Sequence, residues 1–255
     1  MRGLRLLLLP LALLCAAAAA APIRFQNSMA QRTLACTSCH GSEGRAGPDG
    51  YYPRIAGKPA GYLYNQLLHF RDGRRHYGLM TGLLDPLSDA YLHDIARHFA
   101  SLDLPYPPPQ PPTAPAEVLE RGRLIALQGD AERRIPACAA CHGKALTGVV
   151  PNTPGLLGLS RDYLNAQLGA WRTGQRRALA PDCMAEIARR LEPEDLSAVT
   201  AWLAAERLPA NAKPVSPEPP PVARKKGRRA QPAPAPEPPP MRCGAATPPP
   251  AEAAR

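Results

Sequence analysis

The chain has 255 residues, a formal net charge of +10 and only 5% aromatic residues, which is few for a protein that builds its core from side chains alone. This length allows one or two domains, since domains commonly have about 100–150 residues. Much of the positive charge lies in residues 211–255, where eight Lys or Arg stand against three Glu. The high net charge is therefore no sign of a nucleic-acid-binding function, and we expect no nucleic-acid partner.

The first 21 residues have the pattern of a secretory signal peptide. Arg2 and Arg5 precede an apolar run, and small residues follow as far as Ala20 and Ala21. The apolar run is short for a membrane span, which needs about 20 predominantly apolar residues. We therefore expect export to the periplasm, with a retained N-terminal membrane anchor as the alternative.

The next element in the chain is Cys36-Thr-Ser-Cys39-His40, and the same pattern returns as Cys138-Ala-Ala-Cys141-His142. CxxCH is the sequence to which haem c is attached. Two thiols three positions apart lie on one side of a helical turn, where they can form thioethers with the two vinyl groups of one porphyrin. The adjacent His then reaches the iron from the same side. The alternative, two redox or zinc CxxC motifs each followed by a chance His, does not explain why each motif has its own repeated surroundings.

Helices are expected after each motif, and no segment shows sustained alternation of the strand type. Residues 62–71 and 163–172 place Leu and aromatic residues at i, i+4 and i+8, and Gly73 and Gly174 are plausible stops. The last helix of the first copy is predicted to begin at Ser88, a good N-cap. That of the second copy has Pro193 in its first turn.

These elements belong to a repeat of about 102 residues, in which Tyr, Leu, Gln, Leu, an aromatic residue, Arg and Gly recur in step. The prediction is an all-α fold of two tandem domains, residues 22–104 and 116–210. A Pro-rich linker at 105–115 holds the two units near each other without fusing them. One haem in each domain would replace part of the missing side-chain core.

The proximal iron ligands are then His40 and His142. The second copy contains one Met, Met184, and no other His, which leaves Met184 as the sixth ligand unless the site is five-coordinate or Lys144 binds. In the first copy Met80 follows His40 by nearly the same spacing as Met184 follows His142. The position in the repeat therefore selects Met80 over Met29 and over the runner-up His76. His69, His93 and His98 are expected at the surface or rim.

Each motif is followed after a similar interval by a proline, Pro53 in the first copy and Pro154 in the second. We expect each proline carbonyl to accept a hydrogen bond from Nδ1 of the proximal His and so to fix the imidazole ring. The alternative is a proline that only makes a turn. Six-coordinate His/Met iron has no open position, so it is suited to passing single electrons.

The CxxCHG motif, the Pro-x-x-x-Gly segment, YLxxQLxxFRxGxR and the Met-x-Gly before the last helix together resemble the di-haem cytochrome c4 group of the class I cytochromes c. The similarity covers roughly residues 30–208, in both halves. It implies a periplasmic electron carrier with two covalent haem c groups, a terminal oxidase as acceptor and a quinol-oxidising complex or dehydrogenase as donor. By matching position it gives axial roles to His40, Met80, His142 and Met184.

Residues 211–255 are rich in Pro and nearly free of large apolar side chains, so we expect a disordered, basic tail. Its basic run 224–229 is either a solubilising segment or a tether to an anionic membrane surface or acidic partner. Cys183 and Cys243 could pair with each other. The expectation is instead that Cys183 is a small buried thiol and that Cys243 is free or pairs between molecules.

Two classes of function remain from the sequence. The first is an electron-transfer protein without catalytic residues, and the second is a haem subunit of a membrane-associated dehydrogenase or a di-haem peroxidase. A peroxidase needs an iron with an open or displaceable ligand and an acid–base residue above it. The second copy has no distal His for that role, which favours electron transfer.

Overall fold

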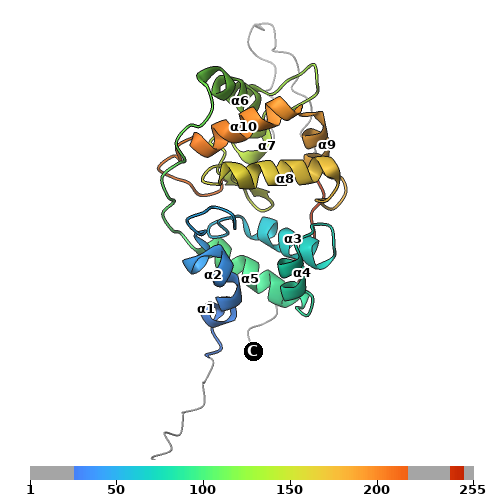
Figure 1. The fold of residues 1–255 in the computed structure, drawn as a ribbon. Coiled ribbons are helices and arrows are strands. Elements are labelled where there is room, and N and C mark those ends of the chain that lie inside the picture. Colours follow the sequence, from blue (N-terminus) through green and yellow to red (C-terminus); the bar gives the residue numbers. More distant parts are fainter. Residues whose placement is uncertain (1–25, 218–241, 250–255) are drawn as a thin grey trace, which may run out of the picture.

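The computed structural model describes residues 26–217 and 242–249. The expected signal peptide and the basic run 224–229 lie outside these residues. The described part is mainly helical and forms two stacked domains, with the first copy of the repeat below the second in Figure 1. No helix among the described residues is long and apolar enough to cross a membrane.

The first domain begins with two short helices that carry the first cysteine motif, α1 (Met29–Arg32) and α2 (Leu34–His40), followed by a 3-10 turn, η1 (Ser42–Gly44). Helices α3 (Ala60–Arg71), α4 (Gly78–Leu84) and α5 (Asp89–Ser101) complete it. Ser88 caps α5, as expected, because its hydroxyl accepts from the Tyr91 amide. Helix α3 packs against α4 and α5, and their apolar faces form the core around Tyr64, Leu92 and Phe99.

The second domain repeats this plan with α6 (Ala116–Gln128), α7 (Cys138–His142), α8 (Arg161–Thr173), α9 (Cys183–Arg190) and α10 (Pro193–Ala205). A small antiparallel pair, β1 (Gly148–Val149) and β2 (Thr153–Pro154), lies between α7 and α8. The sequence did not predict these two-residue strands. Helix α10 packs against α6 and α8, and the core lies around Ile125, Leu157 and Val199.

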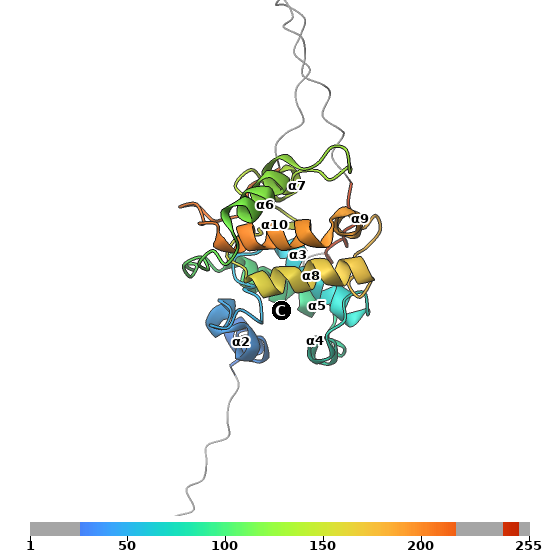
Figure 2. The ribbon, with the colours of Figure 1, turned by 45° about the horizontal axis from the view of Figure 1, so that its top comes forward.

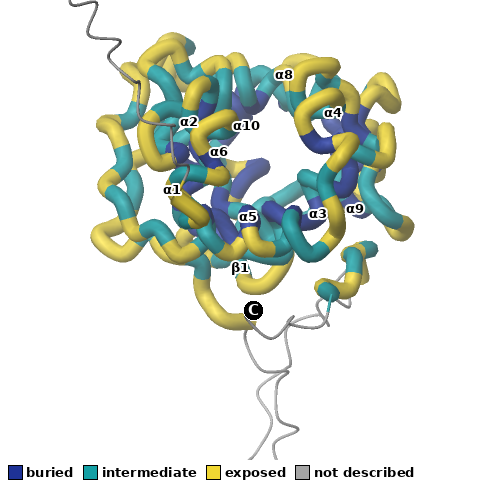
Figure 3. The backbone as a smooth tube through the Cα atoms, turned by 90° about the horizontal axis from the view of Figure 1, so that it is seen from below, coloured by how far each residue is buried: buried dark blue, intermediate teal, exposed yellow. Residues whose placement is uncertain are grey.

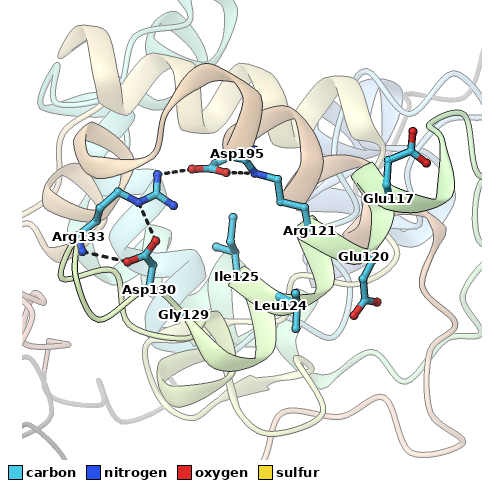
Figure 4. A pocket seen from close by; sticks show the side chains of 9 residues that line it. All are labelled: Glu117, Glu120, Arg121, Leu124, Ile125, Gly129, Asp130, Arg133 and Asp195. Atoms are coloured by element: carbon cyan, nitrogen blue, oxygen red, sulfur yellow. Dashed lines mark hydrogen bonds and ion pairs between the residues drawn. The ribbon is translucent and has the colours of Figure 1, made fainter.

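An ion-pair network fixes the start of α10. Asp195 is fully buried and joins Arg121 of α6, at 2.5 Å, to Arg133 of the following turn. Arg133 also pairs with Asp130 at 2.7 Å, and Figure 4 shows the group lining a surface hollow of domain 2. A buried carboxylate held by two guanidiniums fixes the packing of α6 on α10.

The two domains are in direct contact, beyond what the linker alone would give. Helices α3 and α8 face each other across the interface, and the turns after them form an antiparallel bridge between Arg75 and Arg176. The Ser160 hydroxyl donates to the Gly50 carbonyl at 2.7 Å, and the Tyr62 amide donates to the Pro151 carbonyl at 3.1 Å. The sequence did not predict these contacts, because the groups that make them lie far apart along the chain.

The linker itself is held to both domains. The Arg54 guanidinium donates to the carbonyls of Leu104, at 2.5 Å, and Pro105, at 3.0 Å, and lies over the Tyr106 ring. The Gln110 amide donates to the Ala204 carbonyl of α10 at 3.1 Å. Exposed stretches of the chain lie mainly on the outside of the two-domain body and buried ones inside (Figure 3).

Two parts of the tail differ from the expected disorder. Residues 211–217 lie along domain 2, where Val215 bridges to Val149 and donates to the Gly148 carbonyl. Residues 242–249 are attached by a disulfide between Cys183 and Cys243, and the Ala246 amide donates to Asn65 of α3 at 2.8 Å. The expectation that Cys183 is a free thiol and that Cys243 is free or pairs between molecules was therefore wrong, although Cys183 is buried as expected. Spacing along the chain could not reveal the pair, because the two cysteines are 60 positions apart.

Candidate haem sites

Both cysteine motifs lie on short helices that end at the His. In α2, Cys36 and Cys39 are three residues apart, and His40 is the last residue of the helix. In α7, Cys138 and Cys141 have the same spacing before His142. All four cysteines are free and partly exposed. In the chain before haem attachment, burial raises the pKa of the Cys36 and Cys141 thiols and raises that of Cys138 to about 11.

The residue after each motif must be glycine for a geometric reason. Gly41 has a φ of +75° and Gly143 has a φ of +84°, a backbone region that side chains rarely allow. A Cβ on Gly41 would also lie 2.4 Å from the Ala46 carbonyl oxygen. The chain turns sharply here, and the Ala46 amide donates to the His40 carbonyl at 2.7 Å. The glycine therefore lets the following loop fold back under the His.

The predicted contact between each His and its proline is present in both domains. Nδ1 of His40 lies 2.8 Å from the Pro53 carbonyl oxygen, and Nδ1 of His142 lies 2.7 Å from that of Pro154. A carbonyl can only accept, so Nδ1 carries the proton in each ring and Nε2 keeps its lone pair. Both imidazoles are buried, and this burial lowers the pKa of each. Each His is thus held as a neutral ring with Nε2 available to a metal.

The two methionines selected from the sequence lie near the starts of equivalent helices. Met80 is in α4, which packs on α3, and Met184 is in α9, which packs on α8. Both side chains are partly buried. Figures 1 and 2 show α2 and α4 on opposite sides of the first domain. This arrangement suits a planar group held from two faces.

The interface holds two buried cations that sequence reasoning missed. Arg75 and Arg176 donate to the side-chain oxygens of both Gln66 and Gln167 over 2.7–3.1 Å. Their guanidiniums lie over Phe70 and Trp171, respectively. Both arginines stand at matching places in the repeat, as the final Arg of the YLxxQLxxFRxGxR pattern, but the pattern does not show that the two side chains meet across an interface.

These surroundings fit a covalently bound haem. Within the described residues, neither Arg75 nor Arg176 pairs with a carboxylate, and the buried Nε1 of Trp171 has no hydrogen-bond partner. A haem brings two propionate carboxylates, the kind of acceptor that buried guanidiniums and a buried indole N–H need. The free thiols and the unprotonated Nε2 atoms supply the other bonds that haem c requires.

The sequence analysis expected His69 at the surface or rim, and this was wrong, because the residue lies inside the protein. Its side chain is 4% exposed on α3, and Nε2 has no hydrogen-bond partner. His93 and His98 are partly buried, and His76 is exposed. Burial, with the nearby Arg74, Arg176 and Arg75, lowers the pKa of His69 to about 4. The apolar periodicity of the helix could not predict the burial of His69, because residues of the turns after α3 and α8 lie next to it.

We expect acid to destabilise the fold through His69. Between pH 6.5 and 4 the unfolded chain binds a proton at this residue and the folded chain does not, so the free energy of unfolding falls as pH falls. The loss amounts to about 2–3 kcal/mol. Denaturant unfolding of the holoprotein at pH 7 and pH 4.5 checks this, with His69→Gln as the comparison. An equal acid loss in His69→Gln and in the unmodified chain would contradict the assignment.

Comparisons with known proteins agree with the site. No family model matches the chain. The chain is 40% identical to a thiosulfate dehydrogenase electron acceptor of Thiomonas intermedia, over 68% of this chain and 79% of that protein. It is 34% identical to cytochrome c4 of Pseudomonas aeruginosa, over 68% of this chain and 84% of that protein.

Among solved structures, reduced cytochrome c4 from Pseudomonas stutzeri matches with a TM-score of 0.60 and 28% identity, over 70% of this chain and 97% of that one. Thiosulfate dehydrogenase TsdBA from Marichromatium purpuratum matches with a TM-score of 0.62 and 30% identity, over 69% of this chain and 40% of that one. The relatives named cytochrome c4 or thiosulfate dehydrogenase electron acceptor are electron-transfer proteins and not enzymes, which assigns electron transfer to this chain as well. The chain therefore belongs to the cytochrome c4 family of di-haem electron-transfer proteins, with two covalently attached haem c groups.

Proposed function

We propose that this protein works in the periplasm and takes single electrons from a thiosulfate-oxidising dehydrogenase for delivery to a terminal oxidase. Its irons are held by His40 and Met80 in the first domain and by His142 and Met184 in the second. The thioethers are formed by Cys36 and Cys39 in the first domain and by Cys138 and Cys141 in the second. The single observation that carries the iron sites is the pair of His Nδ1–proline carbonyl hydrogen bonds, at 2.8 and 2.7 Å.

The residues of each site support rapid transfer of one electron. When bound, the haems supply the ferric/ferrous couple. The proline carbonyl holds each imidazole ring in one orientation and makes its Nε2 a better ligand. A methionine thioether is a soft ligand that favours ferrous iron and raises the reduction potential. With two strong ligands in place, little has to move when the iron changes charge.

The donor is proposed from the relatives. Two proteins named thiosulfate dehydrogenase electron acceptor are 40% and 38% identical to this chain, over 79% and 78% of their own lengths. The match to TsdBA covers only 40% of that longer chain. This supports a second candidate function, in which the protein acts as the haem subunit of a stable dehydrogenase complex.

We expect the oxidised, full-length holoprotein to be reduced when a purified thiosulfate dehydrogenase and thiosulfate are both present. Stopped-flow absorbance in the ferrous haem bands measures the reduction, and the controls omit either the enzyme or thiosulfate. No reduction by this enzyme, together with rapid reduction by a quinol-oxidising complex, would overturn the proposed donor. Purification of a stoichiometric complex with a dehydrogenase would favour the subunit role over the mobile carrier.

A further inference from the structure

One lysine of the first domain reaches into the proximal loop of the second. Lys58 is 4% exposed, and its Nζ donates to the Gly155 carbonyl at 3.0 Å. Gly155 follows Pro154, whose carbonyl accepts the proton of His142 Nδ1 at 2.7 Å. The amine of one domain is thus two hydrogen bonds and one peptide unit away from the imidazole of the other.

The charge of this amine acts on the second site. The Lys58 amine is joined to the His142 ring through two hydrogen bonds and the Pro154–Gly155 peptide unit, so its charge acts at short range on the ring that is proposed to hold the iron. Burial, with the positive charge of Arg54 beside it, lowers the pKa of Lys58 to about 7. The groups that face the amine are therefore the charged Arg54 from its own domain and the neutral His142 ring from the other. Among the described residues, no carboxylate pairs with its Nζ and cancels its charge.

The second domain has no equivalent lysine that reaches into the proximal loop of the first. Pro53 and Gly57 correspond to Pro154 and Gly158, so the counterpart of Lys58 is Leu159, which packs against the core of domain 2. Arg54, which follows Pro53 in the loop near His40, donates hydrogen bonds within its own domain and to the linker. Its guanidinium donates to the carbonyls of Ala56, Leu104 and Pro105. The two sites therefore have different electrostatic surroundings despite their matching ligands.

From this geometry we infer that Lys58 of the first domain is a positioning residue that raises the reduction potential of the haem held by His142 in the second. A nearby positive charge in a buried site favours the ferrous state, because ferrous iron carries one positive charge less. The inference rests on the proposed role of His142 as an iron ligand. It makes the two haems unequal through a residue that belongs to neither iron.

The test is a spectroelectrochemical titration of holoprotein with Lys58→Gln, which keeps a donor for Gly155 but removes the charge. All Lys58 variants are made in a protein that also carries Met80→His. This change lowers the reduction potential of the first haem, so that the high-potential transition in the titration belongs to the second haem alone. At pH 6 the Lys58 amine is charged. There we expect the ratio of ferrous to ferric iron in the haem of the second domain (haem 2), measured at fixed potential, to fall roughly tenfold in Lys58→Gln. This corresponds to a reduction potential lower by about 59 mV. Lys58→Arg should retain the high potential.

Two further measurements separate the charge from a merely structural role. Lys213→Gln removes an exposed lysine, paired with Asp103, and should leave both potentials unchanged. In the unmodified chain the haem 2 potential should fall as pH rises from 6 to 8, and in Lys58→Gln and Lys58→Arg this slope should vanish. The potential falls because protonated Lys58 stabilises ferrous iron, and Lys58 loses its proton as pH rises through its pKa of about 7.

The inference is overturned if Lys58→Gln leaves the haem 2 potential unchanged, or shifts both haems equally, while two haems per chain and the near-infrared band of Met-ligated ferric iron are retained. Failure of the proposed function has a different signature. In that case the band would be missing from the unmodified protein, before any change at Lys58.

Discussion

Met184→His is expected to lower the reduction potential of the second haem by roughly 0.2 V and to leave the first haem unchanged. Imidazole is a harder ligand than a thioether and stabilises ferric iron, and axial ligands set haem potentials over about 0.8 V. Potentiometric titration should therefore separate the two haems clearly. The near-infrared band of Met-ligated ferric iron should fall to about half, because Met80 still supplies one such site.

Met29→Leu is the matched control, because Met29 packs against the first core from α1 and is not assigned to an iron. It should change neither potential. Met184→Leu offers a second probe without a new ligand, and it should open one iron to carbon monoxide. A full near-infrared band in Met184→His, or no carbon monoxide binding in Met184→Leu, would show that another residue holds this iron.

Cys138→Ser with Cys141→Ser is expected to yield a chain with one covalent haem in place of two. A serine hydroxyl does not replace the thiol that forms the thioether, so the second domain cannot be loaded covalently. Part of that domain's core should be lost with the haem, since Cys138 packs against it. Mass spectrometry of the intact chain and haem quantitation measure the result. Thermal unfolding should show an earlier transition for the second domain.

The chain provides its own control in the other two cysteines. Cys183→Ser with Cys243→Ser removes the disulfide and the same number of sulfur atoms, yet it should leave two haems per chain. If this pair also lost a haem, the separation of attachment cysteines from the disulfide would be wrong. If the variant with Cys138→Ser and Cys141→Ser kept two covalent haems per chain, the assignment of haem c to the second motif would be wrong.

The local chemistry of the sites could be predicted from the sequence. CxxCH places two thiols and an imidazole within two turns of one helix, and that geometry depends on spacing alone. The prolines after His40 and His142 lie close along the chain, so the loop that brings each carbonyl back to Nδ1 is a local structure. The duplication supplied a second copy of every signal, and it selected Met80 and Met184 by position. The helices at 62–71 and 163–172 followed from apolar periodicity for the same local reason.

The contacts between distant parts of the chain were decided only by the tertiary structure. The Lys58–Gly155 contact, the Arg75–Arg176 bridge and the Cys183–Cys243 disulfide join residues 60 or more positions apart. The burial of His69 likewise depends on turns and side chains brought from elsewhere. Periodicity and spacing describe how one segment is built, whereas such contacts depend on how two built surfaces meet. The sequence alone therefore predicted what each haem site contains, and the packing of the domains decided which residues from the other domain surround each site.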